Sequence, residues 1–212
     1  MIEVALFPIP NSVNFPGVPC PLHVFEPRYR QMVRHCLDNQ LMMGVCHTEK
    51  ILHSTDNQQS LEQALQSNQS TYKPCDIFSA GPVRLIEELD DGRMVIEVDM
   101  IMRLRLHTEI QTLPFNIWAC EEWPDQAISD VQQQGLDQAK EKIFQRLLVL
   151  THQNPEFQTA LKGPFWQQMT AQEFSFSVMG LVGMDANHKQ QLLEITHPLE
   201  RLEQVLALLN SL

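Results

Sequence analysis

The segment from Leu6 to Arg30 constrains the fold of this chain more than any other. It holds six prolines, at positions 8, 10, 16, 19, 21 and 27. Proline fixes φ and lacks a backbone donor, so the segment can form neither a long helix nor a central strand. A disordered proline-rich linker would be polar, whereas this segment is rich in apolar side chains. We therefore expect a rigid path that wraps a core with Leu6, Phe7, Val13, Phe15, Val18, Leu22, Val24 and Phe25.

A helix is expected directly after this segment, over residues 27–38. Pro27 suits the first helical position, where its missing N–H is not needed. Glu26 precedes it and can accept hydrogen bonds at the positive end of the helix. Apolar residues then recur every three or four positions, which places them on one face. These residues are Tyr29, Met32, Val33, Cys36 and Leu37.

The remainder of residues 1–122 is predicted to be β-rich. Asp90-Asp91-Gly92 between two apolar runs predicts a hairpin. Residues 49–73 are polar and are expected to form a weakly ordered surface insertion, with a short helix over about 60–67 that a capping-box pattern indicates. The expected strands are 4–9, 22–25, 41–48, 77–89, 94–100, 103–106 and 115–120.

The composition changes at Trp123-Pro124-Asp125, after which helical spacing dominates. Thr170 and Glu173 form a capping-box pattern, and Pro198 marks another helix start. The expected helices are 129–151, 170–180, 186–195 and 198–210, the last with Leu199, Leu202, Leu206 and Leu209 at helical spacing. The sequence thus predicts an α+β protein with a β-rich domain at 1–122 and a helical bundle at 123–212.

Charge and composition restrict the partners and the compartment. The net charge is −11, which disfavours nucleic acid and anionic membrane surfaces. No apolar run approaches the 18 residues of a membrane span, and the N-terminus lacks a signal-peptide pattern. Five cysteines without regular spacing fit free thiols in a reducing compartment. We expect a cytoplasmic protein that does not bind membranes.

Motifs for catalysis or cofactor binding are missing from the sequence. It contains no GxxxxGK[ST], GxGxxG, GxSxG, HExxH or CxxC pattern. His35, Cys36, Cys46 and His47 are residue types that bind zinc. Cys36, however, falls on the apolar face of the expected helix, and His35 points about 100° away from it. The sequence therefore predicts no metal, no cofactor and no catalytic residues.

Several motifs resemble the N-terminal, substrate-binding domain of Lon proteases. The most specific are Leu6-Phe7-Pro8, Phe15-Pro16-Gly17 and the run Pro21–Arg30, followed by Met32. Weaker similarity lies at Gly44-Val45, Gly92-Arg93, Arg103-Leu104, Lys189–Glu194 and Arg201-Leu202, so the resemblance covers essentially the whole chain. Two features depart from the family: Ile77-Phe78-Ser79 replaces Ile-Gly-Thr, with Gly81 displaced, and the tract 49–73 is longer.

The resemblance implies a PUA-like, partly open β-barrel joined to a helical bundle. It also implies a non-enzymatic module that binds unfolded or exposed apolar protein segments, with a protease or chaperone complex as a further partner. No ATPase or protease motif follows, so the chain resembles a free-standing domain of this kind. The candidate peptide-binding residues are Phe15, Pro16, His23, Phe25, Glu26, Arg28, Tyr29 and Trp118.

Two other functions stay open at this stage. PUA-like barrels often bind RNA, which would require a contiguous basic face. The arginines that would have to form it are Arg28, Arg30, Arg34 and Arg103. The other function is small-ligand binding or hydrolysis, which would require a cleft that joins Cys20, His23 and Glu26.

Overall fold

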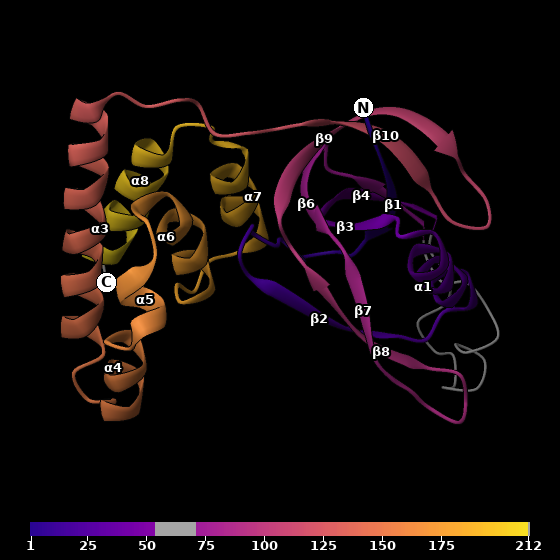
Figure 1. Cartoon of the computed structure of the whole chain (residues 1–212), viewed down its shortest axis with the longest axis horizontal. Coiled ribbons are helices and arrows are strands. Elements are labelled where there is room, and N and C mark those ends of the chain that lie inside the picture. The colour runs from indigo at the N-terminus through magenta and orange to yellow at the C-terminus, as the bar shows by residue number, and fades with distance from the viewer. Residues whose placement is uncertain (54–70, 212) are drawn as a thin grey trace. The chain divides into compact units, whose positions relative to one another are not determined.

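A parallel pair of strands closes the first sheet of this protein into a barrel. The computed structural model describes residues 1–53 and 71–211, and it confirms the α+β fold (Figure 1). β1 pairs with β10 in antiparallel and with β3 in parallel orientation, so the barrel is closed, where a partly open one was expected. Its strands, in order around the barrel, are β1 (Ile2–Pro8), β10 (Ile117–Glu122), β9 (Met102–Gln111), β6 (Ile77–Gly81) and β3 (Met42–Cys46).

Strand β1 is apolar at consecutive positions because both of its faces are buried. Val4 and Leu6 pack inside the barrel with Phe78, Leu104 and other residues. Ala5 points the opposite way and belongs to a second core cluster. Successive side chains of a strand alternate between faces, so a strand buried on both sides loses its polar positions.

The second core cluster lies beneath a three-stranded sheet and helix α1 (Pro27–Asn39). The helix predicted over 27–38 is confirmed, and it buries Tyr29, Met32, Val33 and Cys36 as expected. One detail was wrong: the Glu26 side chain makes no capping hydrogen bond to the helix. The strand order in this sheet is β2 (Pro19–Val24), β8 (Met94–Asp99), β7 (Val83–Glu88).

Strands β6 and β7 correct the single strand that was expected over 77–89. Pro82 separates them, because it supplies no backbone donor to a ladder. The antiparallel partner of this ribbon, β8 and β9, passes in the same way from the small sheet into the barrel (Figure 1). The hairpin at Asp90-Asp91-Gly92 is confirmed, with Gly92 at φ 81 and its N–H 2.8 Å from the Leu89 carbonyl oxygen.

The two ends of the expected insertion 49–73 are strands, which the polar composition did not indicate. β4 (Thr48–His53) and β5 (Thr71–Pro74) form an antiparallel pair. Backbone pairing alone imposes no apolar requirement on a two-stranded ribbon, so hydropathy misses it. The short helix expected over 60–67 lies outside the described residues.

The helices of the C-terminal half begin with recognisable caps. Ser129 and Gln132 form one capping box, and Thr170 and Glu173 form the predicted one. Short helices α4 and α5 were not expected; each begins with a proline at its first position. The helices are α3 (Asp130–Leu150), α4 (Pro155–Leu161), α5 (Pro164–Gln168), α6 (Ala171–Ser177) with a 3-10 turn at Val178–Gly180, α7 (Ala186–Glu194) and α8 (Pro198–Asn210). Within the described ranges, none of the helices has both the length and the apolar character needed to cross a bilayer.

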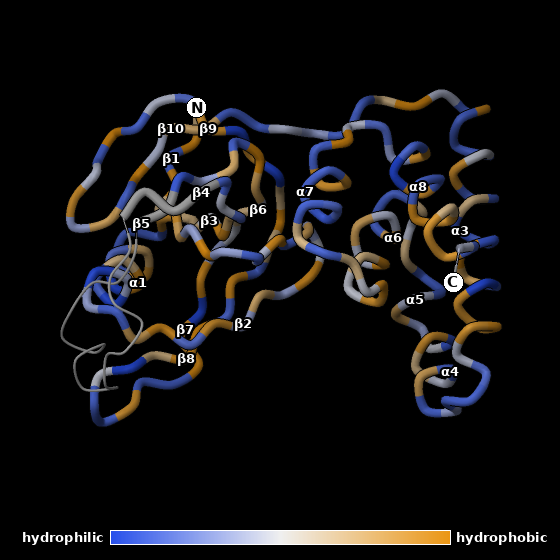
Figure 2. The backbone as a smooth tube through the Cα atoms, turned by 180° about the vertical axis from the view of Figure 1, so that it is seen from behind, coloured by the Kyte–Doolittle hydropathy of each residue, from blue (hydrophilic) through white to orange (hydrophobic). Residues whose placement is uncertain are grey.

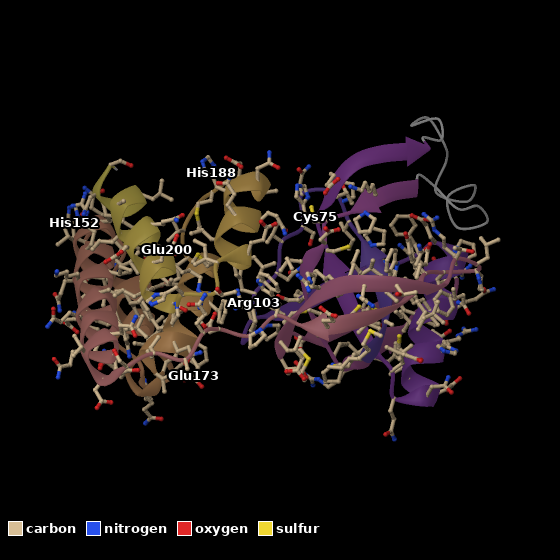
Figure 3. The ribbon with its side chains drawn as sticks, turned by 90° about the horizontal axis from the view of Figure 1, so that it is seen from above. Cys75, Arg103, His152, Glu173, His188 and Glu200 are labelled. Atoms are coloured by element: carbon tan, nitrogen blue, oxygen red, sulfur yellow. The ribbon has the colours of Figure 1, made fainter. Side chains whose placement is uncertain are left out.

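The chain forms two compact units whose limits interrupt the chain order. The first unit is Met1–Pro124 with Asp185–Leu193, and the second is Asp125–Met184 with Glu194–Leu212. Most of α7 therefore belongs to the barrel unit. Arg103 of β9 donates to the Leu193 carbonyl oxygen at 2.6 Å (Figure 3), and Gln190 donates to the Ile77 carbonyl oxygen at 2.9 Å. The domain limits 1–122 and 123–212 stay a prediction, because compactness does not test independent folding.

Candidate functional site

Three of the candidate peptide-binding residues meet at the start of α1. The Arg28 Nε lies 3.1 Å from the Glu26 Oε2, and the guanidinium carbon lies 4.5 Å from the Tyr29 ring centroid. Tyr29 also packs on Phe7, with ring centroids 4.0 Å apart. The Glu26 and Arg28 side chains are only 13% and 14% exposed. This cluster fixes the path from the proline-rich segment into the helix and leaves a small charged rim at the surface.

The other candidates lie elsewhere in the barrel unit. Phe15 is 3% exposed and belongs to the core, whereas Pro16 and Phe25 are half-buried. His23 is exposed on β2. Trp118 packs against the barrel-interior cluster, while Tyr29 belongs to the cluster beneath the small sheet. A role of these residues in binding remains a prediction.

The cleft required for a hydrolase is not assembled from the expected residues. Along β2 the buried and exposed positions alternate, so Cys20 and His23 point to opposite faces of the sheet. Cys20 is 5% exposed, and burial raises the pKa of its thiol to about 11. A thiol of this kind stays protonated near neutral pH and is a poor nucleophile.

The remaining cysteines are also buried, and none of them forms a disulfide with a described residue. Burial raises the pKa values of Cys36 and Cys120 to about 12. The pKa of Cys46 is raised well above its ordinary value, first by burial and then by the neighbouring Cys75 and Cys120. In residues 1–53 and 71–211, no group of three or more histidine, cysteine or acidic side chains could hold a metal ion. These thiols therefore serve as apolar packing groups.

We predict that a thiol reagent distinguishes this arrangement from a reactive cysteine. At pH 7.4, most of the five thiols of the native protein should stay unmodified by Ellman's reagent over minutes, because they are buried and protonated. All five should react at once in guanidinium chloride. Absorbance at 412 nm gives the count, and Cys20→Ser should leave the native trace unchanged. A fast native phase that this substitution removes would restore Cys20 as a nucleophile.

The arginines that a nucleic-acid site would need do not form one basic face. Arg103 is buried, at 4% exposure, by its contact with α7. Arg34 pairs with Glu88 at 2.6 Å, and Arg28 pairs with Glu26. Paired and buried guanidinium groups cannot neutralise phosphates, which supply most of the affinity for nucleic acid.

The barrel unit instead exposes several large apolar side chains that the sequence analysis missed. Leu85 and Ile86 of β7 are 40% and 57% exposed, and hydrophobic positions occur along β7 and its neighbouring strands (Figure 2). Ile101, Ile110 and Leu113 are 56%, 51% and 79% exposed. Leu85 was expected only to lie on a strand, and β7 stands at the end of its sheet.

The helical unit carries a shallow hollow of about 460 Å³ between α3 and α8. Val149 and Leu206 line it together with charged side chains that include Lys142 and Arg146. The Arg146 Nε donates to the Leu209 carbonyl oxygen at 3.1 Å, so this side chain is held by α8. The lining contains no histidine, cysteine or hydroxyl side chain.

Comparison with known families supports the resemblance of the proline-rich segment. The family model of the ATP-dependent protease La (LON) substrate-binding domain matches residues 3–211. The chain belongs to the Lon substrate-binding domain family. The predicted resemblance to this family is therefore confirmed, and it covers nearly the full chain.

Solved structures of Lon N-terminal domains share the fold. A Lon N-terminal domain protein from Xanthomonas campestris is 21% identical, with a TM-score of 0.59 over 98% of both chains. The N-terminal domain of the Mycobacterium avium complex Lon protease is 12% identical, with a TM-score of 0.67 over 99% of this chain and 98% of that one. At these identities the matches establish the fold of this Lon-family chain and leave its binding partner to be inferred.

Proposed function

We propose that this Lon-family chain is a non-enzymatic module that binds exposed apolar segments of unfolded or damaged proteins. The observation that carries the proposal is the match of residues 3–211 to a domain described as substrate-binding in an ATP-dependent protease. The chemistry of the described residues supports a binding role over a catalytic one. Burial raises the pKa of the Cys20 thiol to about 11, which keeps it protonated, and Glu26 is paired with Arg28.

The surface of the barrel unit supports recognition of apolar clients. Leu85, Ile86 and Leu113 lie at the surface, where apolar contact contributes roughly 25 cal/mol per Å² of area removed from water. The charged rim at Glu26 and Arg28 is a second region that a client could reach. The net charge of −11 favours clients with basic residues next to their apolar ones.

We further propose a cytoplasmic location and a protease or chaperone complex as the recipient of bound clients. Five buried cysteines that form no disulfide fit a reducing compartment. Nucleic acid is not the proposed partner, because Arg28 and Arg34 are paired with acidic side chains and Arg103 is buried. An adaptor of this kind needs client affinity but no active site of its own.

The proposal predicts selective binding of an unfolded protein by the full chain. Fluorescently labelled, reduced and carboxymethylated lactalbumin should bind saturably, with a dissociation constant on the order of 10 μM by fluorescence anisotropy. The same protein with its disulfides intact should not bind, because its apolar segments are buried. The absence of saturable binding up to about 100 μM, or equal binding of both forms, would contradict the proposal.

A further inference from the structure

The small sheet β2-β8-β7 has two edges, and its hydrogen bonds show which backbone groups point outward. The Asp99 N–H donates to the Pro82 carbonyl oxygen at 3.0 Å, so Asp99 faces the β7 side of the sheet. The Leu89 N–H donates to the Arg93 carbonyl oxygen at 2.8 Å, so Arg93 faces the same side. Backbone groups of an antiparallel strand alternate in direction. Positions 93, 95, 97 and 99 of this ribbon therefore bond toward β7, and positions 94, 96 and 98 bond toward β2.

The edge of β2 is protected against further pairing. Cys20, Leu22 and Val24 lie opposite positions 98, 96 and 94, so their backbone groups bond to β8. The residues that point outward are Pro19, Pro21 and His23. Two of these three carry no N–H, which leaves a single donor on this edge. Prolines of this kind are a common device against unwanted strand addition.

The edge of β7 lacks that protection. Arg84 lies opposite Glu97 and bonds inward, so Val83 and Leu85 direct both N–H and C=O away from β8. In the part of the chain that the structure describes, β7 pairs with β8 alone, and no other backbone hydrogen bond reaches Val83 or Leu85. Two donors and two acceptors are thus available to an added strand.

The side chains on this edge fit the same partner. Val83 packs on the core, while Leu85 and Ile86 are 40% and 57% exposed. A protected edge would carry charge at these positions. The register shift between Leu85 and Glu87 ends the regular edge, so that only a short segment fits. Glu87 is exposed and forms no ion pair with any described residue, which favours a basic residue beside the apolar ones.

We infer that β7 binds an extended client segment as a fourth strand of this sheet. Main-chain hydrogen bonds to Val83 and Leu85 hold the segment. Its alternate apolar side chains pack beside Val83 and Leu85, which share one face of the strand. A basic residue flanks them near Glu87. The inference rests on the proposed function and adds to it the site, the extended conformation and the side-chain pattern of the client.

Two proline variants test the edge directly in the full chain. Leu85→Pro removes an outward N–H and leaves the bonds to β8. Asp130→Pro is the control, because it places a proline at the exposed first position of α3 in the helical unit, where the helix needs no N–H. The probe is a fluorescein-labelled peptide of alternating valine and threonine between terminal lysines. Leu85→Pro should weaken its binding at least tenfold, and Asp130→Pro should change it less than twofold. Methylation of alternate peptide nitrogens should abolish binding to the wild-type chain.

A measurement on the wild-type chain avoids any effect of substitution on folding. Peptide at saturation should slow hydrogen exchange at the Val83 and Leu85 amides, which form no backbone hydrogen bond to a described residue in the free chain. The Arg84 amide, which already bonds to β8, should change little. Protection at Arg84 alone, or at the His23 edge, would overturn the inference.

The outcomes separate this inference from the proposed function. Suppose that the wild-type chain binds carboxymethylated lactalbumin, that Leu85→Pro binds the valine–threonine peptide as tightly as wild type does, and that the methylated peptide still binds the wild-type chain. The β7 site is then wrong and the proposed function stands. If the wild-type chain binds neither probe, both fail. Dimers that form with increasing concentration and vanish in Leu85→Pro, measured by sedimentation, would assign the edge to a second copy and also overturn the inference.

Discussion

Replacement of Arg201 by methionine is expected to lower the free energy of unfolding of the helical unit by about 3–5 kcal/mol. Arg201 is fully buried, and its guanidinium forms two bonds to the Asp125 carboxylate, at 3.0 and 2.7 Å. It also donates to the Ser175 hydroxyl and the Ile195 carbonyl oxygen, and it lies 3.7 Å above the Phe176 ring. Methionine fills the space but leaves the Asp125 carboxylate, 2% exposed, without its charge partner.

Urea unfolding followed by circular dichroism at 222 nm would measure this loss, since the helices dominate that signal. With a slope near 2 kcal/mol/M, the midpoint should fall by about 2 M. The urea midpoint of Arg201→Lys should lie between those of wild type and Arg201→Met, because lysine keeps the charge but cannot present a planar fork of donors. Lys162→Met, at an exposed position of the same unit, is the matched control and should stay within about 0.5 kcal/mol of wild type. A cost below about 1 kcal/mol for Arg201→Met would show that the pair is not buried as described.

Helical spacing located α8 correctly but not the residues on its buried face. Leucines at 199, 202, 206 and 209 predicted that face, and only Leu202 and Leu209 are buried. Arg201 and Val205 complete the buried side instead. A sequence pattern assigns arginine to solvent unless its partner is known, and Asp125 lies 76 residues away in the chain. Such a pair depends on tertiary packing, which periodicity does not contain.

The first helix was predictable because local rules agree there. Pro27 begins α1, four buried side chains follow the helical period, and the family motif coincides with both. Local rules could not show whether Ile77-Phe78-Ser79, which replaces the family's Ile-Gly-Thr, fits the fold. Phe78 is fully buried, and its ring fills the space where a side chain on Gly44 would lie, 2.2 Å from a Cβ placed there. Phe78 on β6 fits only because the register of β6 and β3 places Gly44 beside it, and the sequence does not show this register.

The candidate binding residues were also misjudged for lack of tertiary information. Residues chosen for their motif, such as Phe15 and Tyr29, are buried at 3% and 6% exposure. Motif residues often identify a fold because they hold it together. The β7 edge carries no motif, and its openness follows from strand order and from the outward direction of Val83 and Leu85. The only local signal was the contrast between two prolines on β2 and none within β7.

Substitution of Gly81 by alanine is expected to destabilise the barrel unit by about 3 kcal/mol or more, since added atoms in a packed site force the backbone to move. A Cβ at this position would lie 1.7 Å from the Asp99 carbonyl oxygen and 2.8 Å from its carbon. Both are backbone atoms and cannot rotate away. Gly81 stands where β6 bends into β7, between the Ile101–Ala80 and Asp99–Pro82 hydrogen bonds, each 3.0 Å long. The close approach of the two crossing strands therefore requires glycine, for reasons of space and not of φ.

Thermal unfolding by near-ultraviolet circular dichroism would test this requirement. A cost of about 3 kcal/mol lowers the Tm of a chain of this size by roughly 6–12 °C. Gly183→Ala is the matched control, because no atom lies within 4 Å of a Cβ placed there. A Tm for Gly81→Ala within about 1 °C of the control would contradict the crossing geometry. The same bend sets the direction of β7. Any folded Gly81→Ala protein should therefore also bind the valine–threonine peptide more weakly, because its proposed client edge is displaced.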